Sequence, residues 1–219
     1  MLRLLLAFFV ALITAGCGPH YVDYFPYQDD GTCKPCIALA PIQDCSDSGL
    51  PWDLAEELRD DLRFCSMDNG NIFLLSPKKV EKITDKLGEI DYFNKDIAFA
   101  KEFSQCEFLV VLEMIDHHIQ PYVQGEVAPL YPIRTGRCNN VLMMKVRMRI
   151  IDLREETPCV VLQEIFCSNH MIAKDSEKCD YAKCCWGSDA FGRTPYGVAH
   201  KRMIKDLVDR IECVTWKAR

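Results

Sequence analysis

The segment Cys36-Ile-Ala-Leu-Ala-Pro-Ile42 decides how this chain begins to fold. It is a short apolar run that Pro41 ends and that the turn-forming residues 43–49 follow, so it predicts a buried strand. From Trp52 onward the spacing of apolar residues changes to that of an amphipathic helix. The residues on the apolar face of this helix are Leu54, Leu58, Leu62 and Cys65.

The order of strand and helix is repeated further along the chain. Residues 71–75 predict a second strand, and Ser76-Pro77 predicts the start of a helix, with serine as the N-cap and proline in the first turn. Gly88 marks the end of this helix, and we expect a short third helix over residues 94–103. The apolar stripe of the second helix consists of Val80, Ile83 and Leu87.

Three strands and a helix make up the remainder. The strands are predicted over residues 107–120, 140–153 and 158–170, and the helix over residues 196–213. In the middle strand apolar and basic residues alternate, which gives it one core face and one wet face. The whole order predicts an α/β fold with an α+β tendency. We expect a mixed sheet of about five strands, parallel at its start and antiparallel at its finish, covered by three to four helices.

The first residues have the order of a secretory signal. One positive charge, at Arg3, precedes an apolar run over residues 4–13, which covers only about half of a bilayer. The run ends in Thr14-Ala15-Gly16-Cys17, which resembles the lipobox of bacterial lipoproteins. That resemblance implies cleavage after Gly16 and an N-acyl S-diacylglycerol group, with acyl chains such as palmitate, on Cys17. The alternative is an ordinary signal peptide in which Cys17 is one more disulfide partner.

We therefore predict three parts: a signal peptide over residues 1–16, a lipidated cysteine and tether over 17–35, and one periplasmic domain over 36–219. Two or more acyl chains hold a protein stably on a membrane. The tether is aromatic, and its rings either pack back on the domain or dock on a partner or membrane interface. These rings belong to Tyr21, Tyr24, Phe25 and Tyr27.

Composition limits the partners of the chain. A formal net charge of −6 makes nucleic acid an unsuitable partner, since binding it requires an extended basic surface. Thirteen cysteines are heavy usage for 219 residues, and disulfides persist in exported compartments. The usage also fits cross-linking between molecules in a cell envelope. We expect Cys65, on an apolar helix face, to pack as a small hydrophobe.

Five cysteines are candidates for disulfide bonds. Cys33 and Cys36 have the spacing of a thiol-redox motif, but they precede a strand and lack the helix N-terminus that activates such a thiolate. We expect a structural disulfide between them or pairing elsewhere, and no redox catalysis. Together with Cys179, Cys184 and Cys185 they offer thiolates for zinc, although the second spacing is irregular. We expect no metal and no cofactor.

The remaining chemical motifs are sparse. His117 and His118 are adjacent on a predicted strand and so point to opposite faces, which prevents them from sharing a metal. We expect one to be a surface residue and the other to pack in the sheet. The chain has no nucleophile elbow, phosphate loop or zinc-protease motif. The sequence therefore predicts a protein that is not an enzyme.

Two kinds of surface are candidates for binding a partner. Lys145, Arg147 and Arg149 form a basic row, which either pairs with strand acids such as Glu113 or Glu164 or docks on an acidic partner or lipid headgroups. The predicted loops over residues 120–139 and 168–195 are long enough to suggest a function. Their candidate contact residues are Tyr122, Leu130, Tyr131 and Arg134, with Trp186 and Phe191 in the second loop.

The strand ending in Ala40-Pro41-Ile42, the Leu54-Ala-Glu-Glu-Leu58 helix and the Ser76-Pro77 helix resemble the amino-terminal TolB-type α/β domain. That domain also occurs in lipoprotein activators of penicillin-binding proteins and in curli-secretion-type lipoproteins. Residues 148–156 resemble the strand and turn before its last hairpin strand. The cysteine content is more similar to that of uncharacterised envelope lipoproteins of chlamydia-like bacteria. Prolines in residues 120–139 argue against the membrane hairpins of a curli-type pore.

These resemblances imply a periplasmic adaptor or accessory protein. We predict a lipid-anchored envelope protein, on the periplasmic side, whose partner is another envelope protein. Gly18 does not match the aspartate retention signal for the inner membrane, which favours the outer membrane. The alternatives are a structural component cross-linked by disulfides and, third, a redox or hydrolytic enzyme.

Overall fold

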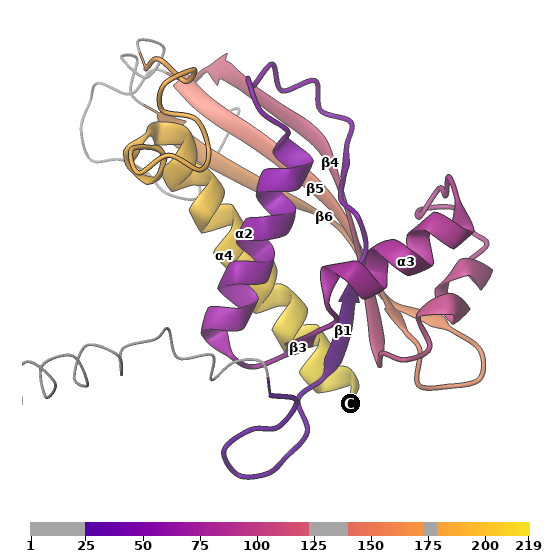
Figure 1. Ribbon diagram of the computed structural model, residues 1–219. Coiled ribbons are helices and arrows are strands. Elements are labelled where there is room, and N and C mark those ends of the chain that lie inside the picture. The colour runs from indigo at the N-terminus through magenta and orange to yellow at the C-terminus, as the bar shows by residue number, and fades with distance from the viewer. Residues whose placement is uncertain (1–24, 123–139, 173–178) are drawn as a thin grey trace, which may run out of the picture.

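A mixed β-sheet forms the centre of the computed structural model, which describes residues 25–122, 140–172 and 179–219 (Figure 1). Its strands follow one another in the order β3-β1-β4-β5-β6, and β2 also pairs with β4. The predicted fold class is therefore confirmed. The strands are β1 (Cys36–Leu39), β2 (Gln43–Asp44), β3 (Phe73–Leu74), β4 (Phe108–Pro121), β5 (Asn140–Asp152) and β6 (Cys159–Ile172).

The sheet is parallel on one side and antiparallel on the other. β1 lies between β3 and β4 and is parallel to both, and β2 continues alongside β4 after Pro41. β4, β5 and β6 form a long antiparallel meander. Alternate residues of β1 enter two different core clusters. Ile37 and Leu39 belong to one cluster, and Ala38 belongs to the other. Burial on both faces explains why its sequence is apolar without alternation.

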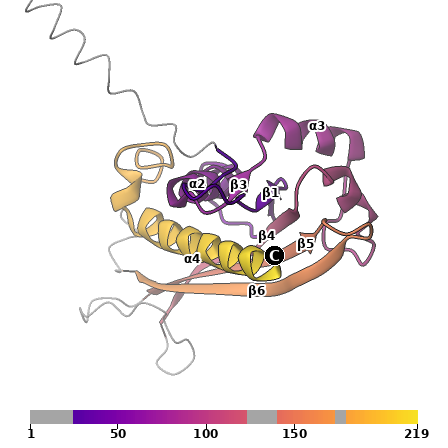
Figure 2. The same cartoon turned by 90° about the horizontal axis from the view of Figure 1, so that it is seen from below.

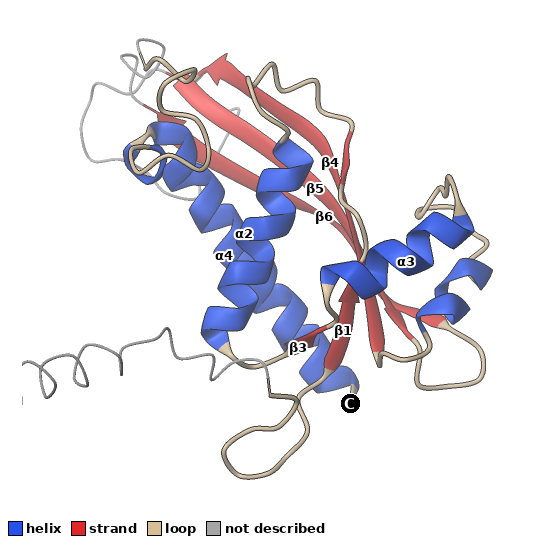
Figure 3. Cartoon of the chain, in the orientation of Figure 1, coloured by secondary structure: helices blue, strands red, loops and turns tan. Residues whose placement is uncertain are grey.

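In the described residues, three α-helices and two short 3₁₀ helices accompany the sheet (Figure 3). Asp53 caps α2 by accepting a hydrogen bond from the Glu56 amide at 3.1 Å, and Gly70, with φ of 68°, ends it. The predicted helix over residues 94–103 is wrong in type and start, because only 98–103 form a 3₁₀ turn. The helices are α2 (Leu54–Asn69), α3 (Pro77–Leu87), η2 (Ala98–Phe103), η4 (Phe191–Arg193) and α4 (Pro195–Ala218).

The helices cover the two faces of the sheet unequally. α2 and α4 lie side by side over one face, and α3 lies on the other side of β1 (Figures 1 and 2). The cluster under α2 and α4 includes residues from β1, β4, β5 and β6, and Cys65 packs against it as predicted. The cluster under α3 and η2 reaches only the start of β4, up to Val111, and the end of β5, from Ile151. The rest of the second face therefore lies beyond the helical cover that the described residues provide.

The described end of the tether is attached to the domain by its backbone. Tyr27 and Cys33 form an antiparallel bridge, and the Arg219 guanidinium donates a hydrogen bond to the Cys33 carbonyl. The rings of Phe25 and Tyr27 remain 64% and 56% exposed, so the expectation that the rings pack back on the domain is wrong for these two. Tyr21, Tyr24, Gly16 and Cys17 lie outside the described residues. Over the described ranges, no helix has the length and apolar character needed to cross a membrane.

Candidate functional site

The most unusual chemistry in the described chain is a buried row of hydrogen-bonded polar side chains between α2, α4 and β4. Trp52 Nε1 donates to Glu57 Oε2 at 2.6 Å. The other carboxylate oxygen of Glu57 lies 2.6 Å from His200 Nδ1, and His200 Nε2 lies 2.9 Å from His117 Nε2. Glu57 and His200 have no exposed surface and His117 is 2% exposed. We call Trp52, Glu57, His200 and His117 the buried polar row.

Two imidazoles and one carboxyl group form the centre of the row. The His200 ring bridges the other two groups, with Nδ1 toward Glu57 and Nε2 toward His117, and one of the two facing Nε2 atoms donates to the other. His117 Nδ1 has no hydrogen-bond partner among the described residues. Burial, followed by the proximity of His200, lowers the pKa of His117 to about 3. The row therefore favours an uncharged His117.

Aromatic rings enclose one end of this row. The ring of Tyr196 stacks on that of Tyr181 at 4.5 Å and lies parallel to the His200 ring at 5.9 Å. Phe191 meets Trp52 edge to face at 5.4 Å. A second buried pair lies on the same side of the sheet, where Ser168 Oγ is 2.8 Å from His170 Nε2. Burial, together with the nearby Arg202 and His200, lowers the pKa of His170 to about 4.

The buried polar row differs from a catalytic triad in its third group. A carboxylate, an imidazole and a third group stand in the order of a catalytic triad, but the third group is another imidazole and not a hydroxyl or thiol nucleophile. The hydroxyl of Ser168, on the same side of the sheet, pairs with His170. Neither hollow found in the described residues is lined by the buried polar row. We therefore assign the row to bracing α2 and α4 against β4.

One member of the buried polar row could be predicted from the sequence. One of the adjacent histidines was expected to be buried and the other exposed, and the structure has His117 buried and His118 exposed. Glu57 and His200 were not predicted. Their signal was present, because Glu57 lies three residues after Leu54 and His200 four residues before Ile204, within the apolar stripes of their helices. A polar residue in such a stripe needs a buried partner.

The basic row of β5 is engaged within the molecule. Lys145 Nζ lies 2.9 Å from Asp116, and Arg147 Nε donates to Glu113 at 2.7 Å, the cross-strand partner expected for it. Arg149 is only 5% exposed, so the prediction that it docks on a partner is wrong. Its guanidinium donates to Gln163 and to the carbonyls of residues 92, 93 and 94, each at 2.8 Å.

Two further expectations about this surface are corrected. Glu164 does not pair with the basic row, because it faces α4 and binds Arg210 at 2.8 Å. The predicted loops are also shorter at their starts, because β4 runs to Pro121 and β6 to Ile172. Tyr122 directly follows β4 and is half-buried. Leu130, Tyr131 and Arg134 lie outside the described residues.

The described cysteines are thiols in this structure. They number eleven and include all five disulfide candidates, Cys33, Cys36, Cys179, Cys184 and Cys185. Burial raises the pKa of the Cys179 thiol, and the neighbouring Cys184 thiol adds to this rise. Across the described ranges, no group of three or more histidine, cysteine or carboxylate side chains is placed to hold a metal ion.

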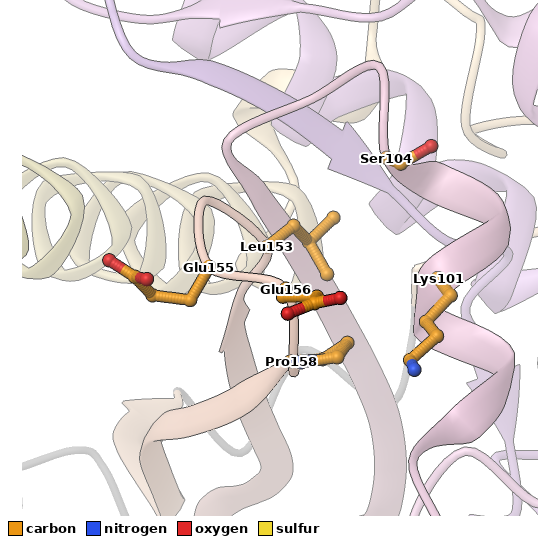
Figure 4. A pocket seen from close by; sticks show the side chains of 6 residues that line it. All are labelled: Lys101, Ser104, Leu153, Glu155, Glu156 and Pro158. Carbon is orange, nitrogen blue, oxygen red and sulfur yellow. The ribbon is translucent and has the colours of Figure 1, made fainter.

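The larger hollow lies between η2 and the β5–β6 turn (Figure 4). Its volume is about 250 Å³, below the ~300–1,000 Å³ usual for small-molecule sites, and it has no aromatic lining. Figure 4 shows Lys101 and Glu156 on opposite sides of it. The lining residues are Lys101, Ser104, Leu153, Glu155, Glu156 and Pro158. We do not assign a ligand to this open hollow.

Fold and site define a mixed α/β domain in which the buried polar row joins α2 and α4 to β4. The chain belongs to the family of unknown function DUF7499, which it matches over residues 23–218. No curated protein matches it.

Among solved structures, the hypothetical protein CT253 from Chlamydia trachomatis is 22% identical, with a TM-score of 0.62 over 84% of this chain and 98% of that chain. This likeness confirms the expected similarity to uncharacterised chlamydial proteins at the level of the fold. The lipoprotein GNA1162 from Neisseria meningitidis is 10% identical, with a TM-score of 0.41 over 81% of this chain and 97% of that chain. A minor lipoprotein from Acinetobacter baumannii is 9% identical, with a TM-score of 0.37 over 86% and 96%. The TolB-type resemblance stays a prediction.

Proposed function

We propose that this protein is a lipid-anchored envelope protein, not an enzyme, that acts as an adaptor by binding a strand of another envelope protein along the edge of β6. The observation that carries the binding role is the state of that edge. β6 ends the strand order and has 14 residues, and no described strand pairs with its outer side. An unpaired row of backbone donors and acceptors is a template for adding a strand.

The usual protections of an edge strand are missing over most of β6. Its sequence contains no proline, lysine or arginine, and its one charged residue, Glu164, is held by Arg210. A register shift lies near its start, between Ile150 and Ile151 of the neighbouring strand, and leaves the stretch after Leu162 regular. Val160 and Ile165 are 42% and 56% exposed. This edge supports a strand-shaped partner better than an acidic one, because the nearby cations are already paired.

Photo-crosslinking in intact cells tests the binding role. A photoreactive amino acid at Gln163 should form an adduct with one other envelope protein, and the same group at Phe64, which is 72% exposed on α2, should not. Adding Ile165→Lys should remove the Gln163 adduct, because a lysine on the edge opposes strand addition. Equal adducts at Gln163 and Phe64, or an adduct that survives Ile165→Lys, would refute the proposal. An adduct of twice the chain mass would identify the partner as a second copy.

The anchor rests on the signal over residues 1–16 and on Cys17, which would carry the N-acyl S-diacylglycerol group. Replacement Cys17→Ser should abolish incorporation of labelled fatty acid and release the chain from membranes, with Cys33→Ser as the control that keeps both. Membrane fractionation tests the outer membrane, which Gly18 favours. Fatty acid label that persists in Cys17→Ser would exclude this anchor.

A second candidate function is a structural role in a disulfide-linked network. It is favoured by four exposed thiols, those of Cys33, Cys45, Cys159 and Cys167. Electrophoresis of freshly alkylated envelopes separates the two candidates. The network predicts a ladder of large species without reductant that collapses to a monomer with reductant, whereas the adaptor predicts a monomer in both conditions.

A further inference from the structure

Two cysteines far apart in the sequence meet where the sheet begins. Cys36 is the first residue of β1, and Cys106 lies just before the start of β4 at Phe108. The Glu107 amide donates to the Cys36 carbonyl at 2.8 Å, and Ile37 pairs with Phe108 in parallel register. Neighbouring strands lie about 4.8 Å apart, and a disulfide bond requires Cα atoms roughly 4.4–6.8 Å apart. Cys106 directly precedes the residue that lies opposite Cys36, so the strand pairing brings the two cysteines to the same end of the sheet.

The side chains of the two cysteines also meet. Cys106 is 5% exposed and belongs to the core cluster under α3 and η2, and Cys36 packs against the same cluster. Cys36 Sγ approaches the Gln105 carbonyl oxygen at 4.0 Å. The two thiols lie close enough for each to shift the pKa of the other. The two cysteines therefore meet at the edge of one core cluster.

The competing partner of Cys36 is Cys33, which is three residues away in the sequence. Its thiol is exposed, whereas that of Cys36 is half-buried. The backbone of Cys33 is held in the bridge with Tyr27 and by Arg219 at the rim of the domain. The spacing of Cys33 and Cys36 in the sequence therefore does not make them disulfide partners, because one thiol is exposed at the rim and the other is half-buried.

We propose that Cys36 and Cys106 form a structural disulfide bond that joins β1 to the segment leading into β4, and that Cys33 is not its partner. In the cell this bond rests on the proposed export, because disulfides persist in oxidising compartments. The bond can form in the purified protein wherever the cell places the chain. A failed disulfide test therefore does not refute the proposed export, and a failed anchor test does not refute the disulfide.

The two thiols differ in a way that gives the reaction a direction. The hydrogen bond from Cys106 lowers the pKa of Cys36, and the same hydrogen bond, with burial, raises the pKa of Cys106. The more accessible Cys36 thiolate attacks one sulfur of an oxidised dithiol carrier, and the carrier's other sulfur leaves as a thiolate. Cys106 then loses its proton and attacks the Cys36 sulfur of the mixed disulfide, and the carrier's remaining sulfur leaves as a second thiolate. The two protons and two electrons that the cysteines lose reduce the carrier to its dithiol.

Peptide mapping of the purified full-length chain in detergent tests the pairing. The folded protein is reduced, reoxidised with glutathione disulfide, unfolded in the presence of an alkylating agent, and cleaved before aspartate. Cleavage places Cys33 and Cys36 on the peptide 30–43 and Cys106 alone on the peptide 96–115. We expect loss of the alkylated 96–115 peptide and appearance of a reducible 30–43 to 96–115 pair.

Matched variants assign the sulfur atoms. In Cys33→Ser the linked peptide pair should persist, and in Cys36→Ser the alkylated 96–115 peptide should return. Cys106 that stays alkylated in the wild-type chain, or that stays protected in Cys36→Ser, would overturn the inference, as would loss of the linked pair in Cys33→Ser. An unfolded Cys36→Ser variant is recognised by circular dichroism. In that event Cys33→Ser and the wild-type peptide pair decide the assignment.

Discussion

The two faces of the sheet handle polar side chains differently. On the face under α2 and α4, Glu57 and His200 have no exposed surface, and their hydrogen bonds join the two helices to β4. On the opposite face, beyond the cover of α3 and η2, the side chain of Lys145 keeps 38% of its surface exposed while it pairs with Asp116. Glu57 and His200 therefore depend on their buried partners, whereas the pair of Lys145 and Asp116 stays in contact with water.

The difference has a physical cause in the desolvation of charge. Removing a charge from water costs several kcal/mol, which close partners must compensate. A charge that stays in contact with water loses little when its partner is removed. Disruption of the buried polar row should therefore be far more costly than disruption of the ion pairs on the open face.

The largest expected effect is that of Glu57→Ala. It leaves His200 Nδ1 and Trp52 Nε1 without their acceptor in a buried site. We expect a loss of about 3–5 kcal/mol in the free energy of unfolding, measured by urea denaturation. Lys145→Ala, on the open face, is the control and should cost about 1 kcal/mol or less. Similar losses for the two variants would show that the faces do not differ.

The second prediction compares apolar side chains on the two faces. Leu207 of α4 has no exposed surface, whereas Ile165 of β6 is 56% exposed. Leu207→Ala should cost about 3 kcal/mol, since it leaves a cavity in the core. Ile165→Ala should change the free energy of unfolding by about 0.5 kcal/mol or less. A large loss from Ile165→Ala would mean that a further part of the chain covers this edge.

The third prediction concerns pH and the adjacent histidines of β4. The folded pKa of His117, about 3, lies below the value of about 6.5 in an unfolded chain. As the pH falls below 6.5 the unfolded chain binds the proton first, so the stability that neutral His117 contributes is present above about pH 6.5 and is lost progressively toward pH 3. The loss should reach roughly 2 kcal/mol at pH 5. Urea denaturation at several pH values measures it.

His117→Gln should remove this part of the pH dependence whatever its effect on stability at neutral pH. His118→Gln, at the exposed neighbouring position, should retain the acid-side loss. If both variants keep the wild-type pH dependence, the acid sensitivity arises elsewhere in the fold.

The smallest expected effect on stability is that of Ile165→Lys, because its side chain already contacts water. Its free energy of unfolding should stay within about 0.5 kcal/mol of the wild-type value. Calorimetry on the purified variant checks this. A much larger loss would mean that any missing crosslink at Gln163 reflects unfolding and not a blocked edge.

Local patterns of the sequence determined much of this architecture. The apolar run at Cys36, the helical spacing from Leu54 and the alternation in residues 142–150 place the strands, the first helix and the core face of β5. These predictions succeed because each pattern is the residue repeat of one helix or strand that packs on the core. The pairing of Arg147 with Glu113 was also foreseeable, since the two strands are neighbours in an antiparallel meander.

Tertiary structure alone decided which polar groups meet. Glu57 and His200 are 143 positions apart, and no local repeat indicates that their helices cross at these residues. The alternation of β4 requires His117 and His118 to face opposite sides, and the irregularity of the strand between Met114 and Asp116 puts His117 on the face under α2 and α4. Likewise, Cys36 meets Cys106 and not the nearer Cys33, because parallel strand pairing brings distant backbone together while a short hairpin holds Cys33 at the rim.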